Sequence, residues 1–127
     1  MKTITFEQIL VLHEFELAKY GGSSGIRDMG MLKSALGRPF ATFGGEDLYS
    51  DIFLKCATLV QSIVENHPFV DGNKRTAFVF ATVVLELNKY LLRVNQMEVV
   101  EFMVKVAKEN LSIDEISSWL QKHSKKI

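Results

Sequence analysis

The sequence predicts a single all-α domain of about six helices, with a loop or a small β-hairpin near residues 40 to 50. Three observations lead to this fold class. Apolar residues recur at helical spacing through most of the chain. Three short segments have the capping-box pattern that begins a helix. The most apolar stretch, Lys74 to Asn88, contains no Gly or Pro over a length of about 15 residues, which favours a buried helix over a strand.

The bulk composition limits the class of protein. A chain of 127 residues fits one domain, residues 1–127, and 47% hydrophobic residues suffice for a core. The 15 basic residues balance the 15 acidic ones, so we expect no direct nucleic-acid partner. The single cysteine, Cys56, excludes an intrachain disulfide and is expected in the core.

The sequence also predicts a protein that is soluble and cytoplasmic. The N-terminus MKTITFEQ lacks the basic, apolar and small-residue zones of a signal peptide. The most apolar run, Ala77 to Leu87, is shorter than the roughly 20 residues that a membrane span requires. We therefore expect no membrane partner.

The first half of the chain contains clear signals for helix starts and ends. Thr5 and Gln8 form a capping box, and Gly21-Gly22 end the helix that follows it. A second helix is expected from Asp28 to Gly37. The turn-rich segment that follows could be a loop or a hairpin around Gly44-Gly45.

The second half predicts four further helices. One follows Ser50, and its apolar residues recur at helical spacing. The next is the apolar stretch from Lys74 to Asn88, although its valines and threonine favour strand locally. The last two begin at the capping pairs Asn95 with Glu98 and Ser112 with Glu115, and the lysines Lys122, Lys125 and Lys126 suit the negative end of the final helix.

The segment from His67 to Arg75 has the residue types of an anion-binding site. It is a loop that leads into a helix, and the free N–H groups and dipole of a helix N-terminus bind anions. Gly72 allows the backbone to approach a ligand closely. Lys74 and Arg75 lie where the helix dipole disfavours cations, which is reasonable if a phosphate binds between them and the amides.

Two more side chains of this loop complete a phosphoryl- or nucleotidyl-transfer site. Asp71 is a candidate Mg²⁺ ligand, because Mg²⁺ usually binds through one or two carboxylates together with substrate phosphates. His67 is the candidate general base for a hydroxyl nucleophile that attacks phosphorus. The residues alone also allow a simpler interpretation, a solvated loop in which Asp71 serves only in a turn.

This segment resembles the motif of the Fic family, H-x-F-x-D/E-G-N-G/K-R, and the likeness extends to nearly the whole chain. GIRDMGMLKSALGRP and FGGEDLYSD resemble the stretches that precede the motif in Doc-type members, and ELNKYLL resembles the end of the motif helix. The likeness is least clear over residues 95–127. It implies a compact Fic-fold bundle in which a hairpin, here Phe43 to Tyr49, pairs with the backbone of a target protein. The matched motif positions are His67, Phe69, Asp71, Gly72, Asn73, Lys74 and Arg75.

Two departures from the AMP-transferring branch of the family resemble Doc-type members. Lys74 stands where that branch has Gly, and Phe78 stands where it has a second Arg. Doc-type members are thought to bind ATP in the reversed sense and to transfer its γ-phosphoryl group. The resemblance thus implies a protein kinase of unusual fold that acts on elongation factor Tu and arrests translation.

The resemblance also implies a role for each motif residue. His67 would deprotonate the target hydroxyl, and Asp71 would bind Mg²⁺. The backbone at Gly72 and the side chains of Asn73, Lys74 and Arg75 would hold the phosphates of ATP. Phe69 would anchor the loop on the core.

We expect a separate protein to inhibit the activity of this chain. Many Fic proteins contain an inhibitory helix with the pattern S/T-x-x-x-E-G/N, which we do not find in this sequence. Doc-type toxins are usually paired with a small antitoxin, so we expect a cognate antitoxin that binds in trans.

Two other functions remain open at this stage. The chain could be a nucleotidyl transferase that attaches AMP to a protein hydroxyl, or a Fic-fold protein without catalysis that only binds a partner. Outside the motif, His13 lies on the apolar face of the first helix and is expected to be a buried core histidine.

Overall fold

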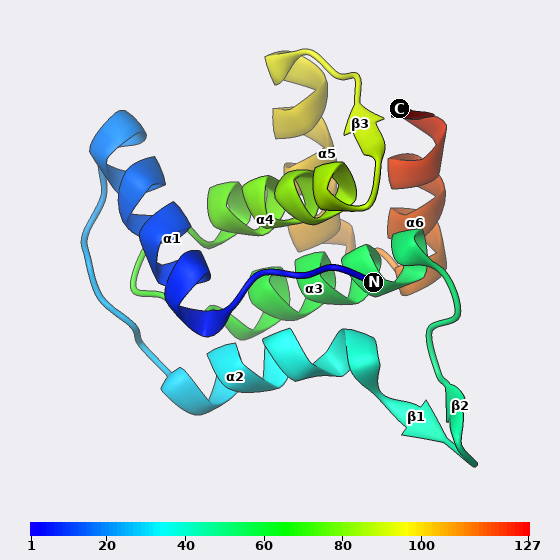
Figure 1. Cartoon of the computed structure of the whole chain (residues 1–127). Coiled ribbons are helices and arrows are strands. Elements are labelled where there is room, and N and C mark those ends of the chain that lie inside the picture. The colour runs from blue at the N-terminus through cyan, green and yellow to red at the C-terminus, as the bar shows by residue number, and fades with distance from the viewer.

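The computed structural model describes all 127 residues as six α-helices with two small strand pairs. The central helices α3 and α4 lie side by side, with α1 on the left, α2 beneath α3, α5 passing behind α4 and α6 on the right (Figure 1). This agrees with the predicted helical bundle. The helices are α1 (Phe6–Tyr20), α2 (Met29–Gly37), α3 (Ile52–Asn66), α4 (Asn73–Leu87), α5 (Gln96–Glu109) and α6 (Ile113–Lys122), and a 3₁₀ turn, η1 (Arg38–Phe40), follows α2.

The helix starts are those that the capping patterns predict. All three boxes form, with reciprocal bonds between Thr5 and Gln8 in front of α1 and equivalent pairs in front of α5 and α6. Each box satisfies two backbone donors that a helix start leaves without an intrahelical partner. The local sequence therefore determines where these three helices begin.

The core is built mainly on α3 and α4. Both helices have 15 residues, and α4 is helical despite its β-branched residues. Phe80, Val84 and Leu85 of α4 are fully buried, so packing outweighs the local strand preference. Cys56 is buried in α3 as expected, and this burial raises the pKa of its thiol to about 12. No helix is long and apolar enough to span a membrane.

The segment near residues 40 to 50 is a hairpin, which decides between the two predicted alternatives. Strands β1 (Thr42–Phe43) and β2 (Glu46–Asp47) pair in an antiparallel register around Gly44 and Gly45. Both glycines have positive φ angles, 61° and 82°, as a tight two-residue turn requires.

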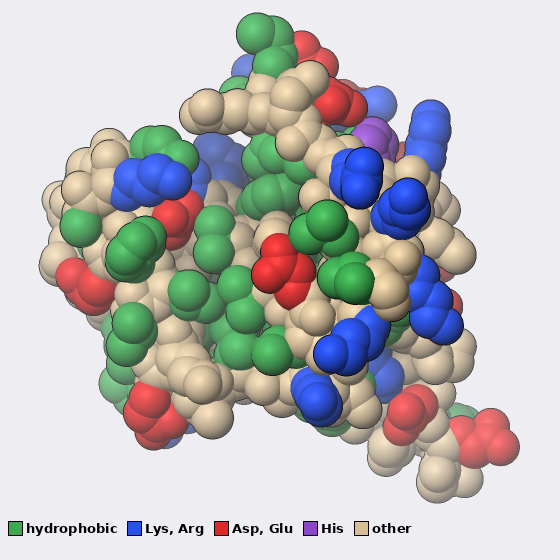
Figure 2. Space-filling view, turned by 45° about the horizontal axis from the view of Figure 1, so that its top comes forward, with side chains coloured by type: hydrophobic (Ala, Val, Ile, Leu, Met, Phe, Trp, Pro, Cys, Tyr) green, Lys and Arg blue, Asp and Glu red, His purple; other side chains and the backbone are tan.

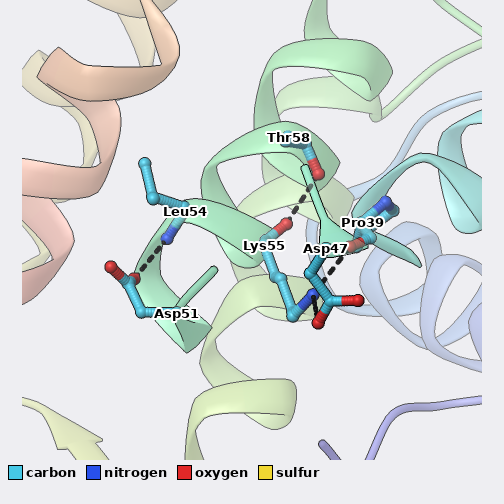
Figure 3. A network of polar contacts seen from close by, with 6 residues as sticks. All are labelled: Pro39, Asp47, Asp51, Leu54, Lys55 and Thr58. Carbon is cyan, nitrogen blue, oxygen red and sulfur yellow. Dashed lines mark hydrogen bonds and ion pairs between the residues drawn. The ribbon is translucent and has the colours of Figure 1, made fainter. Parts of the chain in front are cut away.

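A buried lysine holds this hairpin to the body of the protein. Lys55 of α3 donates hydrogen bonds to the Pro39 carbonyl at 3.0 Å and to the Asp47 carboxylate at 3.2 Å (Figure 3). The Lys55 side chain is 8% exposed, whereas the Asp47 side chain is 56% exposed. The hairpin thus projects from the N-terminal end of α3, and His67 follows the C-terminal end.

The chain contains a second strand pair that the sequence analysis did not predict. Strands β3 (Tyr90–Leu92) and β4 (Ser124–Lys126) are antiparallel, with Leu91 opposite Lys125. Lys125 and Lys126 therefore belong to a strand, and only Lys122 lies in the last turn of α6. The prediction that all three lysines end the last helix was wrong for these two residues. Because residues 124–126 pair with β3, the helix ends before them.

Candidate functional site

Two residues with left-handed backbone conformations shape the loop between α3 and α4. His67 caps the C-terminus of α3 with φ 47° and ψ 58°, and Gly72 caps the N-terminus of α4 with φ 76° and ψ 19°. A positive φ is unfavourable for a non-glycine residue, although histidine tolerates it better than most. The His67 side chain is exposed, and no hydrogen bond to its imidazole is formed within the protein. The imidazole is therefore not engaged by any other group of the protein.

Asn73 and Phe69 lock the inside of the loop. The Asn73 side chain accepts a hydrogen bond from the Phe69 N–H and donates one to the Phe69 carbonyl, each at 3.0 Å. Asn73 is buried, and Phe69 is fully buried in the core, as the sequence predicts for an apolar anchor. The Asn73 amide is thus engaged within the loop, and any contact with phosphate would come in addition to these bonds.

A segment before α2 lines the outside of the loop. The Arg27 and Asp28 N–H groups both donate to the Pro68 carbonyl, and the Val70 N–H donates to the Gly25 carbonyl. The Arg27 side chain also donates to the His67 carbonyl at 2.6 Å. The loop that contains His67 and Asp71 is therefore fixed from both sides by backbone and side-chain bonds.

The carboxylate of Asp71 is held by two backbone amides. Its Oδ1 accepts from the Gly72 N–H at 2.8 Å, and its Oδ2 accepts from the Ser23 N–H at 3.2 Å. These bonds, from Ser23 first and then Gly72, lower the pKa of Asp71, with a smaller contribution from the Arg75 charge. Each carboxylate oxygen has a further lone pair, so an ionised Asp71 can still bind a cation.

The N-terminus of α4 is the candidate anion-binding surface. No side chain caps this helix, so the backbone N–H groups of its first turn have no partner within the helix. Lys74 in that turn is exposed. The Arg75 side chain donates to the Gly21 carbonyl at 2.9 Å and lies 5.2 Å from the centre of the Tyr20 ring. Its Nε is buried and has no hydrogen-bond partner.

A groove of about 500 Å³ adjoins the site between α1, α4 and α5. Lys74 and Arg75 line one part of it, and apolar residues of α4 and α5, including Val99, Val100 and Val104, line the remainder. Hydrophobic side chains gather over the middle of this face, between α1 on the left and α5 at the top (Figure 2). The groove can thus accept an apolar segment next to the loop.

The structure brings most of the residues singled out in the sequence into one region. His67, Asp71, Gly72, Lys74 and Arg75 lie on the short connection between α3 and α4 and on the first turn of α4. Their proposed chemical roles stay predictions. The structure contains no cluster of three or more His, Cys, Asp or Glu side chains that could hold a metal ion.

Sequence reasoning missed the residues that support the loop from α1 and from the α1–α2 connection. His13 is buried as predicted, but its Nε2 also lies 2.7 Å from the Asp71 carbonyl oxygen. Gly22 has φ 126°, and a Cβ there would lie 2.9 Å from the Asp71 carboxylate. In the sequence, the Gly21-Gly22 pair indicates only the end of a helix. Nothing in it predicts a contact of this segment with Asp71, about fifty positions away.

Comparison with known proteins identifies relatives that cover the fold and the loop. A model described as the Fic/DOC family matches residues 3–85. The chain is 39% identical over 105 residues to Toxin Doc of Mycolicibacterium smegmatis, covering 80% of this chain and 79% of that protein. It is 29% identical over 122 residues to Protein kinase doc of Escherichia phage P1, covering 96% of this chain and 95% of that protein. The matches extend well beyond the loop.

Proposed function

Because this chain belongs to the Fic/DOC family, we propose that it is a Doc-type toxin that transfers the γ-phosphoryl group of ATP to a hydroxyl group of a protein target. The observation that carries the proposal is the α3–α4 connection. It combines the exposed His67, the ionised Asp71 and an uncapped helix N-terminus with Lys74 and Arg75. Its relatives are named as a toxin and as a protein kinase, which supports the same activity.

His67 is the proposed general base. Its imidazole accepts the proton of the target hydroxyl while that oxygen attacks the γ-phosphorus. A new bond forms between the hydroxyl oxygen and phosphorus, the bond from phosphorus to the β–γ bridging oxygen breaks, and ADP leaves. His67 is the C-cap of α3 and so adjoins the negative end of that helix dipole.

Asp71 fits the requirements of a Mg²⁺ ligand. An aspartate is ionised near neutral pH even at its ordinary pKa, and the hydrogen bonds to Asp71 lower its pKa further. The carboxylate is exposed beside the phosphate-binding end of α4. Mg²⁺ commonly uses one or two protein carboxylates and completes its shell with phosphate oxygens and water. When bound there, the ion would neutralise charge that develops on the phosphates.

The first turn of α4 is the proposed phosphate cradle. Its free backbone N–H groups and the Lys74 ammonium supply donors for phosphate oxygens, and the Arg75 guanidinium adds positive charge beside them. Gly72 has the positive φ with which the chain enters the helix here, and its lack of a Cβ leaves room for the Leu17 and His13 side chains. Asn73 is proposed to act mainly by keeping the loop in shape.

Two positions favour γ-phosphoryl transfer over AMP transfer. Lys74 is a bulky cation where the AMP-transferring branch has glycine. Phe78 provides no charge where that branch has arginine, and its ring packs edge-on to Trp119 with 6.5 Å between ring centres. We propose that a site with this arrangement of cations binds ATP in the orientation that presents its γ-phosphate to His67.

Elongation factor Tu is the proposed target, with arrest of translation as the result. The family resemblance assigns the β1–β2 hairpin to the target's backbone, and the edges of this hairpin are free. The hairpin and His67 lie at opposite ends of α3, which is about 22 Å long for 15 residues. A target segment of about seven extended residues would span that distance.

A cognate antitoxin is the proposed inhibitor. An amphipathic helical segment could place its apolar side chains in the groove between α1, α4 and α5. Because Lys74 and Arg75 line the same groove, such a segment would also restrict access to the phosphate cradle. This mode of inhibition accounts for a toxin that lacks an inhibitory helix of its own.

The activity can be tested by expressing the wild-type chain and His67→Ala in bacteria. We expect growth arrest from the wild type alone, and label from γ-labelled ATP but not α-labelled ATP in a target protein of the lysate. Label from α-labelled ATP would instead indicate AMP transfer. Equal toxicity of His67→Ala would contradict any catalytic role for this loop.

A further inference from the structure

His13 contacts the catalytic loop through two kinds of interaction. Its side chain is 2% exposed and lies on the face of α1 that packs against α4. The Nε2 atom lies 2.7 Å from the carbonyl oxygen of Asp71, and because a carbonyl can only accept, Nε2 is the donor. The imidazole also stacks on the Phe69 ring at 3.8 Å between centres, with 11° between the planes.

These contacts act on the peptide group that sets the direction of the Asp71 side chain. The Asp71 carbonyl belongs to the peptide that joins Asp71 to Gly72, and the N–H of that peptide donates to Oδ1 of the Asp71 carboxylate. His13 therefore holds one end of a peptide whose other end holds the carboxylate. The Ser23 N–H holds Oδ2 from the opposite side.

An ordinary core histidine would not require this arrangement. The ring of Phe69 already anchors the loop, and a phenylalanine in place of His13 could preserve an aromatic stack. Only the imidazole also supplies a donor to the Asp71 carbonyl. Without this donor, the Asp71 carbonyl oxygen would face the buried side chain of residue 13 with no hydrogen-bond partner, and an unsatisfied acceptor is costly there.

We infer that His13 is a positioning residue, which orients the Asp71 carboxylate toward the phosphate cradle through the hydrogen bond from Nε2 to the Asp71 carbonyl. The role of this orientation in Mg²⁺ binding rests on the proposed function. The link from His13 to Asp71 does not, and it can be measured without nucleotide.

Two substitutions separate the hydrogen bond from the ring. His13→Phe keeps an aromatic ring on Phe69 and removes the donor. His13→Gln places an amide N–H near the position of Nε2 and removes the ring. A matched control is His123→Phe, because His123 also bonds a backbone carbonyl, that of Trp119 at 2.8 Å, and stacks on the Trp119 ring. That histidine follows α6, away from the loop.

Amide hydrogen exchange measured by NMR tests the link directly. In His13→Phe we expect the Ser23 and Gly72 amides to exchange about tenfold faster, because the carboxylate that accepts from them is no longer fixed. In His13→Gln and His123→Phe these two rates should stay within about twofold of wild type. Unchanged rates in His13→Phe, equal effects of both His13 substitutions, or a uniform increase across all helices would overturn the inference.

Nucleotide binding tests whether the orientation of the Asp71 carboxylate contributes to Mg²⁺ binding. The affinity for a non-hydrolysable ATP analogue should fall about threefold to tenfold in His13→Phe when Mg²⁺ is present, and should be unchanged in EDTA. His13→Gln should bind as wild type does in both buffers. Equal weakening with and without Mg²⁺ would overturn the positioning role. Failure of the wild-type chain to bind the analogue at all would contradict the proposed function, while amide exchange would still decide the link between His13 and Asp71.

Discussion

Asp71 is held in place through both its backbone and its side chain, and it is also the proposed Mg²⁺ ligand. Its backbone carbonyl accepts from His13, and its carboxylate accepts from two amides that belong to different parts of the chain. The sequence identified Asp71 as a candidate ligand because of its place in a short motif. The partners that orient it come from α1 and from the connection after α1, so no local pattern could reveal them.

The lowered pKa of Asp71 leads to a prediction about stability and pH. A group whose pKa is lowered by folding stabilises the folded state fully above its ordinary pKa, and this contribution is lost as the pH falls through the lowered value. Asp71→Asn should therefore be less stable than wild type at neutral pH, and the two should converge in strong acid. Urea unfolding at several pH values measures this difference.

The same substitution separates folding from chemistry. Because Asp71 is exposed, Asp71→Asn should keep the helical circular dichroism of the wild type and lose Mg²⁺-dependent transfer. An unfolded Asp71→Asn variant would mean that this residue is chiefly structural. A folded variant with full activity would contradict its assignment as the metal ligand.

Cys56 provides a prediction about reactivity. Burial in α3 raises its thiol pKa to about 12, and only the thiolate reacts readily with thiol reagents. The folded protein should therefore not react with a disulfide reagent at neutral pH, and one thiol per chain should react after unfolding in urea. Rapid modification of the native protein would mean that the region around Cys56 opens easily.

At the scale of an element, the start of α4 depends on a residue that can adopt a positive φ. Gly72 has φ 76°, and a Cβ there would lie 3.4 Å from the Leu17 side chain. Gly72→Ala should lower the free energy of unfolding by about 1–2 kcal/mol, as measured by urea denaturation. Gly37→Ala is the matched control, since Gly37 has no positive φ and open space around it. Equal effects of the two substitutions would contradict the assigned strain.

The β1–β2 hairpin depends on its anchor to α3. Asp47→Ala would leave the buried Lys55 ammonium without its carboxylate and should lower the free energy of unfolding by about 1–2 kcal/mol. Adding Lys55→Met should recover part of this loss, because it removes the unpaired charge. Glu46→Ala, in the same hairpin but without an ion pair, should have little effect in the same urea unfolding assay. No recovery in the double variant would argue against the anchor.

The elements also differ in how well the sequence predicts them. Capping boxes are contained within four residues, so the starts of α1, α5 and α6 could be located from the sequence. The length of the apolar run identified α4. Strands β3 and β4 have three residues each and pair across more than thirty positions, so neither carries a recognisable pattern. Their formation depends on the fold that brings Tyr90 opposite Lys126.

At the scale of the whole molecule, the bundle brings the loop, the groove and the hairpin onto one scaffold. Helix α3 connects the anchor of the hairpin with His67, and α4 extends from the proposed phosphate cradle along the groove. A target protein and an antitoxin would therefore contact different parts of the same two central helices. The sequence predicted the loop residues and the class of fold, whereas this arrangement required the structure.

The most direct test of the proposed activity is intact-mass spectrometry of bacterial elongation factor Tu after incubation with the purified protein and Mg²⁺-ATP. We predict a mass gain equal to one phosphoryl group with the wild-type chain and none with His67→Ala. A gain equal to AMP would contradict the proposed direction of ATP binding and the interpretation of Lys74 and Phe78. An unchanged mass with the wild-type chain would contradict elongation factor Tu as the target.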